Sequence, residues 1–191
     1  MSQTTLSGYR VLAIVTNYGV EQDELIVPRD HLRERGATVV VAAVTTDPIQ
    51  TLVGDKDPGT SLQPDTTFGD AGSDFDLLLI PGGTLNADAL RLESRAIDTV
   101  RAFASSGRPI AAICHGPWAL VEAGVVDGRT VTSYPSLQAD LRNAGATWVD
   151  RSVAIDDGGA FTLVTSRTPD DLDDFLPAVE KALATGPDVA E

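Results

Sequence analysis

Four segments of the chain are almost continuously apolar and have the length of buried strands. They cover residues 9–16, 38–43, 75–80 and 109–113. A run of this kind indicates a strand whose two faces are both covered, as in a parallel sheet. Amphipathic helical periodicity and helix stop signals predict helices at residues 21–35, 95–106, 118–124, 137–144 and 169–184. Shorter strands are predicted near Thr130 and at residues 147–149 and 160–165.

The alternation of strands and helices predicts an α/β fold with a mostly parallel sheet and helices on both faces. Residues 51–73 are rich in Gly, Pro, Asp and Thr, and we expect a long excursion there that contains a short hairpin. We expect a single domain over residues 9–185, with flexible ends at residues 1–8 and 186–191.

Sites in such folds form beyond the carboxyl ends of the strands, where the strand order switches. Three segments should therefore meet at one edge of the sheet. They are the loop after the first strand, the loop at residues 81–84, and the Cys114–His115 pair.

Charge and composition narrow the classes of function. The 191 residues include 14 basic and 28 acidic side chains, which gives a net charge of −14 and a pI near 4.3. This balance argues against nucleic-acid binding and against binding to anionic membranes, because both need a basic face. A single cysteine excludes an intramolecular disulfide, and the first residues lack the pattern of a signal peptide, so we expect a cytoplasmic protein.

The sequence offers few residues that could bind a metal ion. It holds two histidines and has neither a CxxC nor an HxxxH spacing. We therefore expect no metal site and no cofactor.

Cys114 is the strongest chemical candidate in the chain. It ends an apolar strand and is followed by His115, Gly116 and a predicted helix, which is the layout of a nucleophile elbow. The N-terminus of that helix would favour the thiolate, the reactive form of cysteine. A free cysteine is also often buried as a small apolar side chain, so the strand alone leaves both interpretations open.

Three other groups are expected at the same edge. The Gly82–Gly83 turn would present N–H donors for an oxyanion hole. Glu21 and Glu24 share one face of the first helix. An ionised carboxylate near Cys114 would raise the pKa of the thiol, whereas a protonated one would donate a hydrogen bond to the thiolate. His115 is adjacent to Cys114, but adjacent residues on a turn usually point apart, so the sequence does not establish it as the base.

Four strings of residues resemble the PfpI-type intracellular protease family of the class I glutamine amidotransferase-like superfamily. They lie at residues 112–117, 128–136, 143–150 and 165–171. The resemblance implies a flavodoxin-like, three-layer α/β sandwich that forms homo-oligomers, either dimers or larger rings. It spans roughly residues 10–184, and the 51–73 excursion is its loosest part.

The resemblance also implies roles for individual residues. Cys114 would be the nucleophile and Glu24 the glutamate that bonds it, with the amides of Gly83 and His115 as oxyanion donors. Tyr134 and Glu21 would line the pocket. An acid just past the Gly-Gly turn would reach the histidine of a neighbouring subunit, and its register here indicates Asp88.

Three functions follow as hypotheses. The first is a cysteine-dependent, stress-protective enzyme that acts on reactive carbonyls or their adducts, as a glyoxalase III or a deglycase does. The second is an intracellular cysteine peptidase, which needs an acid to orient His115, and no Cys-His-Asp set within one chain is evident from the sequence. The third is a non-enzymatic redox sensor or chaperone. Glutamine amidotransfer is disfavoured because no histidine follows His115.

Overall fold

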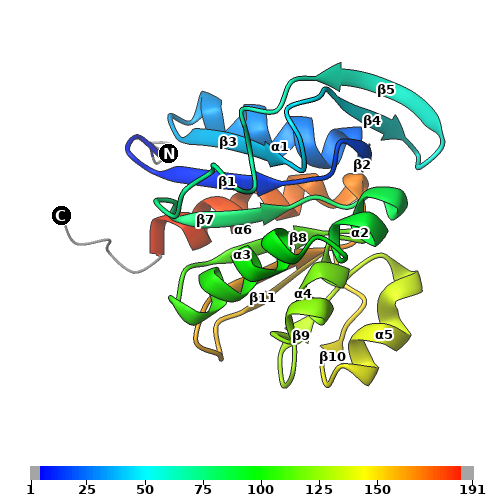
Figure 1. Cartoon of the computed structure of the whole chain (residues 1–191). Coiled ribbons are helices and arrows are strands. Elements are labelled where there is room, and N and C mark those ends of the chain that lie inside the picture. Colours follow the sequence, from blue (N-terminus) through cyan, green and yellow to red (C-terminus); the bar gives the residue numbers. More distant parts are fainter. Residues whose placement is uncertain (1–4, 186–191) are drawn as a thin grey trace.

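The computed structural model describes residues 5–185, and a seven-stranded sheet forms its centre (Figure 1). The order of the strands across the sheet is β11-β12-β8-β7-β1-β3-β6. Their bounds are β1 Arg10–Ile14, β3 Thr38–Ala43, β6 Thr66–Thr67, β7 Leu77–Ile80, β8 Ile110–Ile113, β11 Val153–Asp156 and β12 Leu163–Ser166. The neighbours are parallel except at β11, which pairs antiparallel with β12.

The five central strands have the order of a flavodoxin-like sheet. Numbered along the chain as β1, β3, β7, β8 and β12, they lie in the sheet in the order second, first, third, fourth, fifth. The order therefore switches between β1 and β7, which is the position where ligand sites form in sheets of this type. This topology confirms the predicted fold class.

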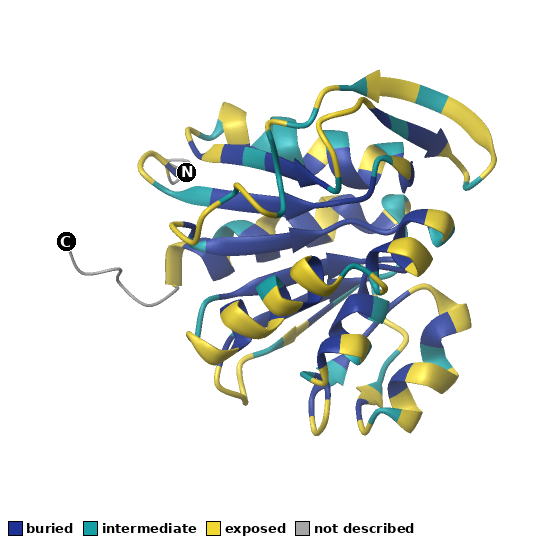
Figure 2. Cartoon of the chain, viewed as in Figure 1, coloured by how far each residue is buried: buried dark blue, intermediate teal, exposed yellow. Residues whose placement is uncertain are grey.

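Helices cover both faces of the sheet (Figure 1). Their bounds are α1 Gln22–Glu34, α2 Thr84–Leu90, α3 Ser94–Ser105, α4 Pro117–Ala123, α5 Gln138–Asn143 and α6 Leu172–Thr185, with 3-10 turns η1 Pro135–Leu137 and η2 Pro169–Asp171. Successive residues of a strand face opposite sides. In β1, Val11 and Ala13 join the core beneath α1 and α6, while Leu12 and Ile14 join the core beneath α3 and α4. The central strands β1, β7, β8 and β12 are accordingly the most uniformly buried part of the chain (Figure 2).

Several elements escaped the sequence pattern because they are short or polar. These are β2 (Tyr18–Glu21), α2 and the antiparallel edge strand β11. The hairpin expected within residues 51–73 exists as β4 (Ile49–Val53) paired antiparallel with β5 (Asp57–Leu62), and it begins slightly earlier than expected. β2 pairs with β4, so this three-stranded unit lies beside the main sheet (Figure 1). The short strands β9 (Thr130–Val131) and β10 (Thr147–Trp148) form a further pair.

The predicted flexible ends fall largely outside the described residues, because residues 1–4 and 186–191 are not described. Flexibility of residues 5–8 stays a prediction, and one residue of this segment is anchored to the core. Leu6 is fully buried, and its N–H donates to the carbonyl of Arg35. Burial of this large apolar side chain holds the segment against the core.

The carboxyl edge of the sheet is closed by direct contact of two backbone turns. A Cβ on Gly116 would lie 2.4 Å from the carbonyl oxygen of Ile80 and 2.9 Å from that of Ile113. A Cβ on Gly82 would lie 2.7 Å from the amide nitrogen of His115. Neither glycine has room for a side chain, so the turn after β7 and the turn after β8 meet at backbone distance.

We predict that Gly116→Ala destabilises the protein by at least about 2 kcal/mol, because strands β7 and β8 must move to admit the methyl group. Gly116 has an α-helical φ of −50°, so steric overlap and not backbone preference causes the loss. Urea unfolding measures the change. Gly158→Ala is the matched control, since its Cβ meets only Asp156 Oδ1 at 3.7 Å. Equal midpoints for the two variants would contradict the close contact.

Candidate active site

Cys114 has a left-handed backbone at the end of β8. Its φ is +61°, and Cys114 and Asp55 are the two non-glycine residues within 5–185 that have a positive φ. Such a conformation costs about 1–3 kcal/mol and persists where the surroundings impose it. Here the Cys114 N–H donates to the carbonyl of Ser166 at 3.0 Å, and the Cys114 carbonyl accepts from the N–H of Tyr134 at 2.9 Å. The turn therefore has the geometry of the predicted nucleophile elbow.

His115 contacts the thiol directly. Its Nδ1 lies 3.1 Å from Cys114 Sγ, so the expectation that these adjacent side chains point apart is wrong. The left-handed conformation of Cys114 changes the direction of the chain between them. On the other side of the ring, His115 Nε2 lies 3.3 Å from the hydroxyls of both Thr84 and Ser136. The Tyr134 ring stacks on the imidazole with a centroid distance of 4.6 Å.

Glu24 is fully buried in the first turns of α1 and faces the same thiol. Its Oε2 accepts a hydrogen bond of 2.7 Å from the N–H of Gly82. Oε1 lacks a well-oriented partner among the described residues, and the carboxyl interacts with the Cys114 thiol. Burial raises the pKa of Glu24 to about 8, against an ordinary value of 4.5. Glu24 is thus largely protonated near neutral pH, the state that can donate to a thiolate.

Burial raises the pKa of the Cys114 thiol, and the Glu24 carboxylate raises it further. A hydrogen bond from the backbone of Gly83 acts in the opposite direction but is smaller. The helix N-terminus was expected to favour the thiolate, and desolvation outweighs that effect here because only 5% of Cys114 is exposed. The resting site therefore holds a thiol, which needs a base when it reacts.

The two amides predicted to form an oxyanion hole lie at the edge of the sheet that carries Cys114, and their role stays a prediction. The Gly83 N–H points at the thiol, and the His115 amide nitrogen lies beside Gly82 on the same edge. Gly83 has a φ of +80°, and a Cβ there would lie 2.3 Å from the carbonyl oxygen of Gly19. Glycine is therefore required for the conformation that directs this amide.

Glu21, predicted to line the pocket, binds the neighbouring hairpin, and its role in the pocket stays a prediction. It is buried, and its carboxylate accepts from the N–H groups of Gly54 at 3.1 Å and Asp55 at 3.0 Å. Glu21 thus holds the turn between β4 and β5. Asp55 in that turn binds Thr84 twice, through the backbone N–H and through the hydroxyl, each at 2.7 Å.

Asp55, Thr84 and Ser136 are polar residues of the site that sequence reasoning missed. The Gly54–Asp55 pair is a turn signal between two strand patterns, and Thr84 directly follows the Gly-Gly turn. These signals mark turns but do not reveal that the turns meet. Asp88, the predicted partner of a histidine in a neighbouring subunit, lies exposed on α2, and that contact stays a prediction.

Comparison with known proteins places this arrangement in a family. A model of the DJ-1/PfpI family matches residues 9–182. The chain belongs to this family. Deglycase PH1704 of Pyrococcus horikoshii is 39% identical over 164 residues, covering 85% of this chain and 92% of that protein. General stress protein 18 of Bacillus subtilis is 38% identical over 165 residues, covering 86% and 92%.

A solved structure of a family member has the same fold. DJ-1beta of Drosophila melanogaster aligns with a TM-score of 0.82 and 34% identity, covering 94% of this chain and 91% of that chain. The family recognised from the four strings and its flavodoxin-like fold are therefore both confirmed.

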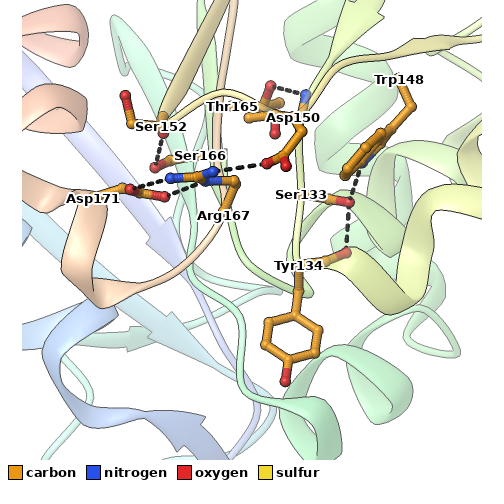
Figure 3. A network of polar contacts seen from close by, with 10 residues as sticks. Ser133, Tyr134, Trp148, Asp150, Ser152, Thr165, Ser166, Arg167 and Asp171 are labelled. Atoms are coloured by element: carbon orange, nitrogen blue, oxygen red, sulfur yellow. Dashed lines mark hydrogen bonds and ion pairs between the residues drawn. The ribbon is translucent and has the colours of Figure 1, made fainter.

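Two of the strings that carry the family resemblance have structural roles next to the site (Figure 3). In the string 165–171, Arg167 bridges Asp150 and Asp171, and the Ser166 hydroxyl donates to the carbonyl of Ser152. In the string 128–136, the Ser133 hydroxyl accepts from the Trp148 indole at 2.9 Å. These bonds fix the segment that presents the Tyr134 ring to His115.

The part of the chain that the structure describes contains neither a candidate metal site nor a candidate membrane-spanning helix. Within residues 5–185, no group of three or more His, Cys, Asp or Glu side chains is arranged to hold a metal ion. Over the same residues, no helix has the length and apolar character needed to cross a membrane.

We predict that Glu24→Gln changes how stability depends on pH. Because the pKa of Glu24 is raised in the folded protein, the folded state binds more protons than the unfolded state between pH 4.5 and about 8. The stabilisation that Glu24 contributes to the folded state is present at low pH and is lost as the pH rises through about 8. Between about pH 5 and pH 8 the wild type should lose up to about 4 kcal/mol more unfolding free energy than Glu24→Gln.

Urea unfolding at both pH values measures this difference. Glu34→Gln is the matched control, because Glu34 is exposed near the other end of α1 and should behave as the wild type does. Parallel pH dependences of the wild type and Glu24→Gln would contradict a buried, protonated Glu24.

Proposed function

We propose that this protein is an enzyme that uses Cys114 as a nucleophile on small reactive carbonyl compounds or their adducts. The observation that carries the proposal is the convergence on one thiol of a base, a buried acid and a backbone amide. His115 Nδ1 lies 3.1 Å from the sulfur, Glu24 interacts with it from α1, and the Gly83 N–H donates to it. This is the set of groups that addition to a carbonyl requires.

The burial of the thiol supports a small substrate. Cys114 is 5% exposed and His115 is 3% exposed. The carbon of a small aldehyde can approach such a buried sulfur readily. The carbonyl carbon of an extended peptide approaches less readily, because it is flanked on both sides by backbone and side chains. The deglycase name of the Pyrococcus horikoshii relative points to the same class of chemistry.

For methylglyoxal the proposed reaction balances without an external oxidant. The sulfur of Cys114 adds to the aldehyde carbon while His115 Nδ1 takes the thiol proton, and the resulting oxyanion accepts from the amides of Gly83 and His115. His115 or Glu24 then carries the proton of the aldehyde carbon to the neighbouring carbon. This transfer converts the hemithioacetal into a lactoyl thioester. Water then releases lactate and the free thiol.

A peptidase is the second candidate, and the direct contact between His115 and Cys114 is the observation in its favour. A peptidase needs the same thiol–imidazole pair. The depth of Cys114 disfavours it. A redox sensor is less well supported, because a buried thiol with a raised pKa is less easily oxidised than an exposed thiolate. The expected homo-oligomer and the contribution of Asp88 to a neighbouring subunit stay predictions.

We predict that purified protein converts methylglyoxal to lactate and that Cys114→Ala reduces the rate to the uncatalysed background. The nucleophile is lost, so kcat and not KM should account for the change. Circular dichroism confirms that the variant is folded. Unchanged lactate formation in Cys114→Ala would contradict the proposed role of the thiol.

A second assay separates the two candidates. Fluorogenic peptides are incubated with the same preparations, both as the dimer and as any larger assembly that size exclusion resolves. The carbonyl proposal expects negligible cleavage in each fraction. Peptide cleavage that depends on Cys114, together with no lactate formation, would replace it with the peptidase.

A further inference from the structure

A chain of contacts leads from His115 to an acid in the same subunit. The Asp55 carboxylate accepts from the Thr84 N–H through Oδ1 and from the Thr84 hydroxyl through Oδ2, both at 2.7 Å. The oxygen of that hydroxyl lies 3.3 Å from His115 Nε2. Glu21 holds Asp55 in place through the backbone of the turn.

The number of available protons decides the direction of each hydrogen bond. An ionised carboxylate only accepts, so the one hydroxyl proton of Thr84 is directed at Asp55. The Thr84 oxygen then turns a lone pair toward His115, and Nε2 must carry the proton that it accepts. In a neutral imidazole the other nitrogen is then unprotonated. That nitrogen, Nδ1, is the one beside Cys114 Sγ.

We propose that Asp55, acting through the Thr84 hydroxyl, is a positioning residue that fixes His115 in the tautomer able to take the proton of Cys114. The inference rests on the proposed role of Cys114 as a nucleophile. Asp55 does not touch the reacting atoms. It supplies within one chain the orienting acid that the sequence did not reveal.

The other groups around His115 do not impose the opposite tautomer. The Ser136 hydroxyl is also 3.3 Å from Nε2 and is free either to donate or to accept. Tyr134 contacts the face of the ring, Trp118 lies 5.4 Å away centroid to centroid, and Glu24 faces Cys114. Burial lowers the pKa of His115 and the Asp55 charge opposes this, so the resting imidazole is neutral.

The proton transfer follows from this arrangement. As the sulfur attacks, the S–H bond breaks and the proton moves to Nδ1, which leaves a positively charged imidazolium. Nε2 keeps its proton and its bond to Thr84, and the negative charge of Asp55 lies beyond the hydroxyl to stabilise the new charge. The imidazolium then gives this proton to the substrate oxyanion, so that the thioester forms with its hydroxyl group. The water that hydrolyses the thioester supplies the proton that restores the thiol, so no group of the protein is consumed.

The substitution Asp55→Asn tests the inference with little change in shape. Asparagine tolerates the left-handed backbone of this position, where φ is +57°. The amide can still accept from the Thr84 N–H, but its NH₂ now faces the Thr84 oxygen as a donor. The hydroxyl proton is then directed at His115 Nε2, and Nδ1 becomes protonated and unable to accept from Cys114.

We expect Asp55→Asn and Thr84→Val each to slow alkylation of Cys114 by iodoacetamide at neutral pH by about 10- to 100-fold, as loss of an outer-shell partner commonly does. Thr84→Ser keeps the hydroxyl and should stay within about threefold of the wild type. The chain has a single cysteine, so the assay reports on Cys114 alone. Lactate formation should fall in parallel through kcat, with KM little changed.

Asp57→Asn is the matched control, because it makes the same chemical change at an exposed position of the same hairpin. Nitrogen NMR of the imidazoles gives the direct readout, since the chain has two histidines, and His31→Gln assigns the signal of His115. The wild type and Asp57→Asn should show His115 protonated at Nε2, and Asp55→Asn should show it protonated at Nδ1.

The inference is overturned if the wild type is protonated at Nδ1, if Thr84→Ser is as slow as Thr84→Val, or if Asp55→Asn reacts as fast as Asp57→Asn. It is also overturned if Asp88→Asn, and not Asp55→Asn, slows alkylation, since the orienting acid would then come from a neighbouring subunit. Alkylation and NMR need no substrate. A wild type that forms no lactate but shows the expected alkylation and tautomers would refute the carbonyl proposal and leave this inference intact.

Discussion

The close contact between the turn after β7 and the turn after β8 is the constraint on which the site depends. Gly82 and Gly116 leave no space for side chains, so the two turns pack backbone against backbone. The contact brings the Gly83 and His115 amides to the same side of Cys114. It also presents the Gly82 N–H to Glu24, which links α1 to the edge of the sheet. A methyl group at either glycine would separate all of these groups at once.

The electrostatics of the site follow from the desolvation of its two acidic groups. Two acidic groups, the Glu24 carboxyl and the Cys114 thiol, lie together where little solvent reaches them, and neither ionises readily at neutral pH. Desolvation thereby keeps the Cys114 thiol protonated. In the proposed mechanism, the reactivity of this thiol depends on transfer of its proton to His115 at the moment of attack, so the orientation of one imidazole controls the reaction.

The fold was largely predictable because its signal is local. The buried strands are continuous apolar runs, and the elbow at Cys114 follows directly from a strand that meets a glycine and a helix. Glu24 was accessible from the family resemblance. The contact of His115 with Cys114 was not, because it depends on a positive φ that the residue types do not announce. Asp55 was missed because 29 residues separate it from Thr84, and only the packing of the hairpin brings the two together.

The β4–β5 hairpin lies outside the seven-stranded sheet, but Ile49 of β4 belongs to the core beneath α1 and α6, and Leu62 of β5 packs against that core. The tip of the hairpin, residues 53–58, is mostly exposed. Changes confined to this tip should therefore be far less damaging to folding than changes at Gly116 or in the buried strands. Such changes would nevertheless remove or replace the carboxylate that reaches Thr84. In the proposed mechanism, the architecture thus separates the nucleophile, which is built into the core, from its orienting acid, which lies in the tip of the hairpin. A lineage with this scaffold can then retune the reactivity of that thiol by exchanging the tip of one hairpin.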